Sequence, residues 1–101
     1  MRAERPLRLG LDRREIAVGS PVTVVVRDRG NKPIEGATIV AGTKRKRTDS
    51  NGRCELTFRS PGFWKIVAAR APTDRVAYEP ASTVVRVVPR TSSGGSTKYV
   101  A

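Results

Sequence analysis

The chain has 101 residues, enough for one domain with a single modest core that needs neither metal ions nor disulfides. Apolar residues make up 38% of it and five residues are aromatic, so the core must consist largely of valine. Twenty Lys and Arg face nine Asp and Glu, and the net charge is +11. A charge of this size indicates attraction to nucleic acid, acidic membranes or acidic proteins, unless it only keeps the surface solvated.

The first third of the chain predicts three short β segments. Residues 1–6 form a charged arm that ends at Pro6. Residues 7–11 alternate leucine with Arg8 and Gly10, which predicts a first strand with one buried face. A short apolar piece follows at 16–18. The strongest strand runs over 22–28, and its inward side chains are expected to be Val22, Val24 and Val26.

The middle of the chain alternates strand and turn signals. Turns are predicted at 28–33, 48–52 and 60–62, where Gly, Pro, Asn, Asp and Ser gather, with Asn51-Gly52 the best hairpin signal. Strands are predicted at 37–41, 53–58 and 63–69. A basic run, residues 44–47, lies between the first of these strands and the second turn.

The last third predicts a long connection, one strand and a tail. Residues 70–81 contain Pro72 and Pro80 and have the length of a crossover between two sheets. The strand at 83–88 should turn Val85 and Val87 inward, and residues 90–101 form a Ser/Gly-rich flexible tail. The expected organisation is an arm at 1–6, a β domain at 7–89 and the tail. No helical period or internal repeat is present.

Short strands at intervals of roughly 8–12 residues predict an all-β protein, a single Greek-key immunoglobulin-like sandwich of about seven strands. Three sequence features carry a family resemblance. They are a D-x-x-G-x-P-x-x-G-A hairpin with one extra residue before the proline, a T-D-x-x-G turn, and a late Pro-Gly before an apolar strand, formed here by Asp28, Gly30, Pro33, Gly36, Ala37, Thr48, Asp49, Gly52, Pro61 and Gly62. Over about residues 16–88 the chain resembles the carboxypeptidase regulatory-like (prealbumin-like) domains and is similar to the immunoglobulin-like repeats of intimin-type adhesins.

The resemblance implies a β-sandwich that acts as a spacer, adhesin or accessory module. Members of those families are normally secreted and attached to larger proteins. This chain has no apolar run of signal-peptide length near its start and no stretch long enough to span a bilayer. We therefore expect it in the cytoplasm or in an assembly that is built inside the cell.

The sequence contains no recognisable set of catalytic residues. Histidine is absent, so a Ser-His-Asp triad cannot form. The acidic residues are scattered without metal-ligand spacing, and no Gly-rich phosphate loop is present. We expect a protein that is not an enzyme and that needs no cofactor or metal.

The strongest charge feature is the run Lys44, Arg45, Lys46 and Arg47. It predicts either a hairpin that contacts phosphates or an edge strand whose cations prevent pairing with other sheets. Alternation along a strand would place two of the four side chains on each face. A second basic group near the amino end completes the candidate polyanion contacts: Arg2, Arg5, Arg8, Arg13 and Arg14.

Four other side chains have an expected place. Cys54, the single cysteine, should share the inward face of its strand with Leu56 and Phe58 as a core residue. Trp64 should point into the core. Its neighbour Phe63 would then be exposed as a candidate contact with a partner. Tyr78 should anchor the long connection by packing.

Together these features predict a structural or binding module that docks through its basic surface and its ends onto a larger assembly, such as a virion or another multi-subunit array. A protein partner or self-assembly is the first expectation. Two alternatives remain open: nucleic-acid binding through the Lys44–Arg47 hairpin, and adhesin-like binding of glycans or surfaces through loops such as 28–33 and 71–81.

Overall fold

The computed structural model describes residues 3–90, so Arg2 and nearly all of the expected tail lie outside it. The described chain is all-β, as the sequence predicted, and contains no helix. Its strands are β1 (Ala3–Pro6), β2 (Arg8–Leu11), β3 (Glu15–Ala17), β4 (Val22–Arg27), β5 (Thr38–Ala41), β6 (Lys44–Arg47), β7 (Arg53–Leu56), β8 (Gly62–Ala69), β9 (Val76–Glu79) and β10 (Ala81–Val88).

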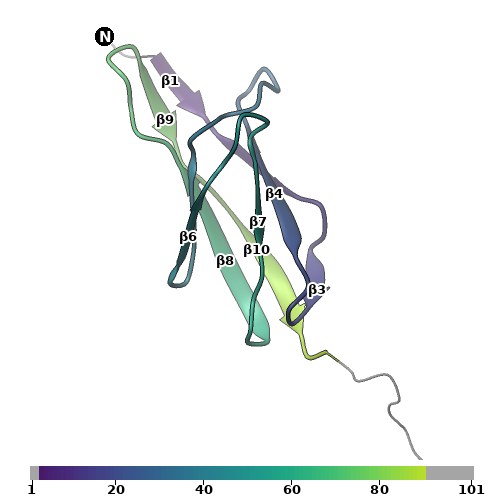
Figure 1. Cartoon of the computed structure of the whole chain (residues 1–101). Helices are drawn as coiled ribbons and strands as arrows, with labels where there is room; N and C mark the ends of the chain where they lie inside the picture. The colour runs from purple at the N-terminus through teal and green to yellow at the C-terminus, as the bar shows by residue number, and fades with distance from the viewer. Residues whose placement is uncertain (1–2, 91–101) are drawn as a thin grey trace, which may run out of the picture.

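The strands form three sheets (Figure 1). The five-stranded sheet has the order β3-β10-β8-β5-β6, and the three-stranded sheet has the order β2-β4-β7. A separate pair, β1 and β9, lies side by side beyond one end of these sheets (Figure 1). Neighbouring strands run antiparallel, except that β3 runs parallel to β10 and β1 runs parallel to β9.

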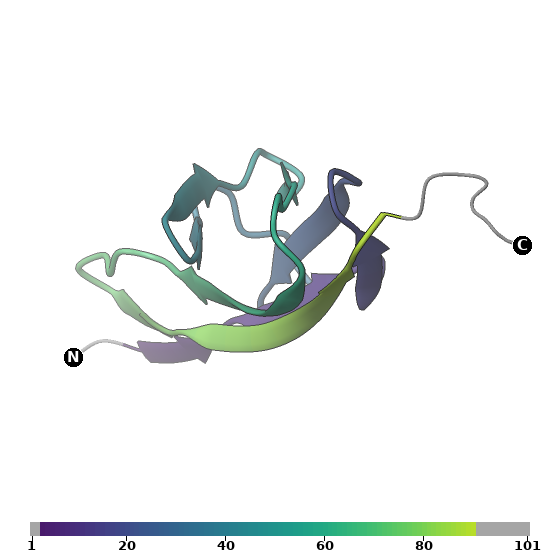
Figure 2. The same ribbon diagram turned by 90° about the horizontal axis from the view of Figure 1, so that it is seen from below.

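The core lies between the two larger sheets. Figure 2 shows the molecule from below, with the long light-green strand β10 of the five-stranded sheet along one side. Val22, Val24 and Val26 of β4 are fully buried, as expected, because strict alternation turns every second side chain inward. The buried cluster also includes Leu7, Ile16, Ala37, Ile39, Ala41, Leu56, Phe58, Ile66, Ala68, Val85 and Val87.

The prediction of a crossover over 70–81 is wrong. Strands β8 and β10, which this segment joins, are antiparallel neighbours in one sheet, with Ala68 opposite Ala81. The segment leaves the sheet and turns at Thr73, whose hydroxyl accepts a hydrogen bond from the Val76 amide at 3.0 Å. It then returns as β9. Pro72 lies in the loop at 70–75, whereas Pro80 is the single residue between β9 and β10.

The charged amino-terminal arm is also a strand, β1, because β9 supplies its hydrogen-bonding partners. After β1 the chain changes sheets at Leu7, which is buried and whose amide donates to the Glu79 carbonyl at 3.0 Å. The next strand, β2, pairs with β4, and β3 then pairs with β10. The amino-terminal segment therefore contacts all three sheets.

Two residues hold together the turns that cross between the larger sheets. The buried Thr48 hydroxyl donates to the Ile34 carbonyl at 2.6 Å and accepts from the Ala37 amide at 2.8 Å. Gly52 has φ +74°, and a Cβ there would lie 2.5 Å from the Val26 carbonyl oxygen. Glycine is therefore required at this close approach of two backbones.

We predict that Thr48→Val destabilises the protein by about 2 kcal/mol, because it leaves the buried Ala37 amide and Ile34 carbonyl without their partner. Thr48→Ser keeps the hydroxyl and should retain most of the stability. Urea unfolding of both variants measures the difference. A loss in Thr48→Ser with full stability in Thr48→Val would show that the methyl group, rather than the hydroxyl, is what matters.

We predict that backbone amides of β1 and β9 exchange with deuterium faster than those of β4 and β8. A two-stranded pair has little sheet on either side, so it opens locally more readily than the strands that enclose the core. Residue-resolved hydrogen exchange tests this. Protection of β1 equal to that of β4 would contradict it.

Candidate functional site

The basic run forms β6, which is an edge of the five-stranded sheet, as one of the two sequence interpretations expected. Lys44 and Lys46 lie opposite the buried Ala41 and Ile39, so they share the inward side of the sheet at its rim. The two arginines lie opposite Val40 and Thr38 and therefore point to the outer face. The four cations are divided two and two between the faces.

The outer face of the five-stranded sheet is the most distinctive surface of the molecule. We call it the Phe63 face. It includes Glu15, Thr38, Val40, Arg45, Arg47, Phe63, Lys65, Val67, Ala69, Ser82, Val84 and Arg86, placed there by alternation with the buried residues of each strand. Phe63 is 76% exposed and Val84 is 48% exposed, and these are the large hydrophobic side chains that the described chain leaves open to solvent.

The residues of the Phe63 face form an apolar centre with a cationic border. Val84 lies opposite Lys65, and two pairing positions along the same two strands Phe63 lies opposite Arg86. The Arg86 guanidinium carbon is 5.9 Å from the centre of the Phe63 ring, a cation–π distance. Arg86 also contacts Glu15 at 3.3 Å. The aromatic ring is therefore exposed but held in place by its charged neighbour.

The three other aromatic positions named above also follow the sequence expectations. Trp64 points inward, half-buried, with its ring 5.1 Å from that of Phe58, and its Nε1 donates to the Ser60 carbonyl at 2.9 Å. Phe58 is fully buried. Tyr78 is half-buried against the core, and the Arg70 guanidinium lies 5.9 Å from its ring centre. None of these rings is available as a platform for a ligand.

The amino-terminal arginines lie away from the basic strand. Arg13 and Arg14 precede β3, the edge of the five-stranded sheet opposite β6. Arg8 is on β2, directly opposite Arg27 of β4. The single polyanion surface that would combine the amino-terminal arginines with Lys44–Arg47 therefore does not form among the described residues.

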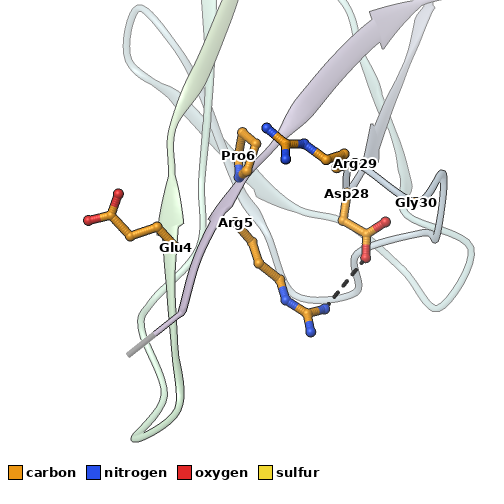
Figure 3. A pocket seen from close by; sticks show the side chains of 6 residues that line it. All are labelled: Glu4, Arg5, Pro6, Asp28, Arg29 and Gly30. Atoms are coloured by element: carbon orange, nitrogen blue, oxygen red, sulfur yellow. Dashed lines mark ion pairs between the residues drawn. The ribbon is translucent and has the colours of Figure 1, made fainter. Parts of the chain in front are cut away.

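Arg5 lines a hollow of about 270 Å³ between β1 and the 28–30 turn (Figure 3). Its guanidinium is 3.8 Å from the carboxylate of Asp28, which is largely buried and also accepts from the Lys32 amide at 2.9 Å. Figure 3 shows Arg5 directed towards Asp28, while Glu4 points away. Arg5 is thus engaged in holding the arm against the turn.

Sequence reasoning missed three arginines that join Arg8 and one valine that joins Phe63. Arg27 lies opposite Arg8 and Arg53 lies on the same outer face, because β4 pairs with both β2 and β7. Arg29 lies in the turn that follows β4. Val84 completes the apolar centre because β10 pairs with β8. Alternation indicated that Arg27 points outward, but no sequence pattern gave the pairing registers.

Cys54 is half-buried on β7, on the inward side with Leu56, as expected. Burial raises the pKa of its thiol above the usual value; nearby Lys46 acts in the opposite direction and Asp49 adds to the increase. The thiol is therefore protonated at neutral pH. Among residues 3–90 no three Cys, Asp or Glu side chains come together as metal ligands.

We predict that iodoacetamide alkylates Cys54 in the native protein much more slowly at pH 7.5 than in urea. The native thiol is less ionised and partly covered, and the thiolate is the reactive species. The native rate should rise with pH beyond the pH at which the unfolded rate levels off. Mass spectrometry of timed samples gives both rates, and equal native and unfolded rates would contradict the prediction.

The described chain contains no helix that is long and apolar enough to cross a membrane. Comparison of the sequence and the fold with protein-family models, curated proteins and solved structures finds no match.

Proposed function

We propose that this protein is a non-enzymatic structural or binding module, an immunoglobulin-like β-sandwich that docks through its Phe63 face onto an acidic protein surface in a larger assembly. One observation carries the proposal. The two large hydrophobic side chains exposed on the described chain, Phe63 and Val84, lie together on one sheet face and are bordered by cations.

The apolar centre supports a protein partner. An exposed aromatic residue is typical of the residues that contribute most to protein–protein interfaces. Phe63 is 76% exposed and lies on an eight-residue strand. Its side chain could turn into the core only if the whole strand shifted by one residue, which would expose the side chains that are now buried. Its burial against a partner would remove this apolar surface from water.

The cations at the border of the Phe63 face support the proposal that the partner is acidic. Arg45, Arg47 and Lys65 have no carboxylate within 4 Å among residues 3–90, while Arg86 is paired with Glu15. A complementary set of carboxylates would pair with these cations and would accelerate association. Two copies of this chain would instead bring cations against cations, so we favour a different protein over a second copy.

Strand β6, at the edge of the five-stranded sheet, supports docking through the Phe63 face and not through the edge of the sheet. Strand β6 consists entirely of lysine and arginine, and cations on an edge strand oppose pairing with another sheet. Association by strand addition at this edge is therefore disfavoured, whereas the Phe63 face is open to a partner.

The strand order supports the immunoglobulin-like part of the proposal. In those domains one sheet contains strands A, B, E and D and the other contains C, F and G, with C′ added in variable-type domains. With β2, β4 and β7 as A, B and E, and β10, β8, β5 and β6 as G, F, C and C′, the two sheets have this order without a strand D.

We predict that a photo-cross-linking residue at position 63 or 84 captures a discrete partner in the native cells or particles that contain this chain. The matched control carries the same residue at position 55, which is exposed on the outer face of the other sheet. The charge reversal Arg45→Glu with Arg47→Glu should abolish the adducts formed from positions 63 and 84. Gel electrophoresis and mass spectrometry identify the adducts and the acidity of the captured protein.

Two results would overturn the proposal. One is an adduct pattern at position 55 equal to that at positions 63 and 84, which would show contact without preference for a face. The other is a captured protein whose yield is unaffected by the charge reversal. Circular dichroism of each variant confirms that the sandwich is intact.

A further inference from the structure

A second charged surface lies on the outer face of the three-stranded sheet. Arg8 and Arg27 are direct cross-strand partners, so their side chains leave the sheet on the same side. Side chains in such a pair have Cβ atoms about 5 Å apart, and like charges placed there destabilise the sheet. The position therefore favours an anion that lies between the two guanidinium groups.

The sheet is hollow beside this pair. Two pairing positions further along, on the same face, Gly10 lies opposite Val25, and a Cβ built on Gly10 would meet no atom within 4 Å. The resulting hollow has a volume of about 170 Å³. We call it the arginine hollow; its lining consists of Arg8, Leu9, Gly10, Val25, Arg27 and Asn31.

Further cations surround the arginine hollow. Arg53 lies opposite Val25 on β7 and shares the outer face with it. Arg29, in the turn that follows β4, lines the other hollow together with Arg5 and the carboxylates of Glu4 and Asp28. The carboxylates of this face, Asp12 and Glu55, lie at its other end, beside and opposite Thr23. None of the arginines that line or flank the arginine hollow has an ion pair with a described carboxylate.

We propose that Arg8 and Arg27 bind phosphate groups of a nucleic-acid backbone in the arginine hollow, with Arg53 and Arg29 contacting phosphates on either side. Guanidinium groups form paired hydrogen bonds with phosphate oxygens, and Asn31 adds a neutral donor at the rim. This site is separate from the Phe63 face and does not depend on the function proposed above.

The form of the hollow favours a polymer over a small phosphate compound. The hollow lies open on the surface of a sheet, and a single exposed ion pair contributes little affinity in water. Several weak contacts along one chain of phosphates add together, and each releases counterions. The outward residues of β2, β4 and β7 include no aromatic side chain, so bases would not stack here and sequence preference should be slight.

The test measures binding of the full chain to a fluorescent duplex DNA of about 15 base pairs over a range of salt concentrations. Arg8→Gln with Arg27→Gln should lower the slope of log affinity against log salt by about 1.8, since each phosphate contact on duplex DNA contributes about 0.9. The same two contacts correspond to a loss on the order of 50-fold in affinity at about 0.1 M salt.

A charge-matched control separates this site from general attraction. Arg45→Gln with Arg47→Gln removes the same charge from the other sheet and should reduce affinity much less. If both double variants lose affinity equally, DNA binding comes from the overall charge of +11 and not from a particular site, and the proposal is wrong. Absence of any DNA binding by the unmodified chain also overturns it.

A second variant tests the hollow without changing the charge. Gly10 is not among the glycines with positive φ and has free space around it, so Gly10→Leu should fold and fill the hollow. It should weaken DNA binding, whereas Ser82→Leu, which places the same side chain on the Phe63 face, should not. Unchanged binding by Gly10→Leu would refute the assignment of the phosphate to the hollow.

Two competitors identify the ligand. Tripolyphosphate at the same phosphate concentration should displace DNA poorly, and an unrelated duplex sequence should displace it fully. Displacement by tripolyphosphate as effective as by duplex would assign the hollow to a small polyphosphate. Displacement by polyglutamate as effective as by duplex would assign it to an acidic protein. Either result would overturn the nucleic-acid proposal.

Discussion

The burial of three valines in β4 is the constraint on which the rest of the structure depends. Val22, Val24 and Val26 are fully buried, and β4 is the central strand of its sheet. Because side chains alternate along a strand, a shift of β4 by one residue would expose all three valines. The register of β2 and β7 on either side is therefore fixed, and so is the outward direction of Arg27.

This constraint gives the molecule two outer faces of different chemistry. On the five-stranded sheet, an aromatic and an aliphatic side chain form an apolar centre with cations around it. On the three-stranded sheet, arginines border a hollow that a glycine leaves open. The first arrangement suits a protein surface, where apolar burial adds to charge pairing, and the second suits phosphates, which need charge and hydrogen-bond donors alone. A basic chain can thus present two separable surfaces.

The amino-terminal segment connects the parts of the fold. Leu7 is buried at the point where the chain passes from β1 to β2, and Arg5 is held near the largely buried Asp28. Residues 3–17 were expected to contribute one full strand and a short piece, yet they contribute three strands in three sheets. Strand β1 exists because β9 is beside it, and the two are about 70 residues apart in the chain. Such a pairing leaves no local pattern in either segment.

The sequence alone determined the fold class, most strand positions and the direction of most side chains. Val, Ile and Leu at every second position placed Ile39, Ile66 and Val85 inside and Phe63 outside, since alternation is a local property of the strand. An edge strand was one of two interpretations of Lys44–Arg47, and alternation divided these side chains between two faces. Only the tertiary structure decided which strands are neighbours. The partners of Phe63 and Arg8, namely Arg86 and Arg27, come from cross-strand registers that link distant segments. Those registers depend on how the whole core packs, so both candidate sites became visible only in the folded chain.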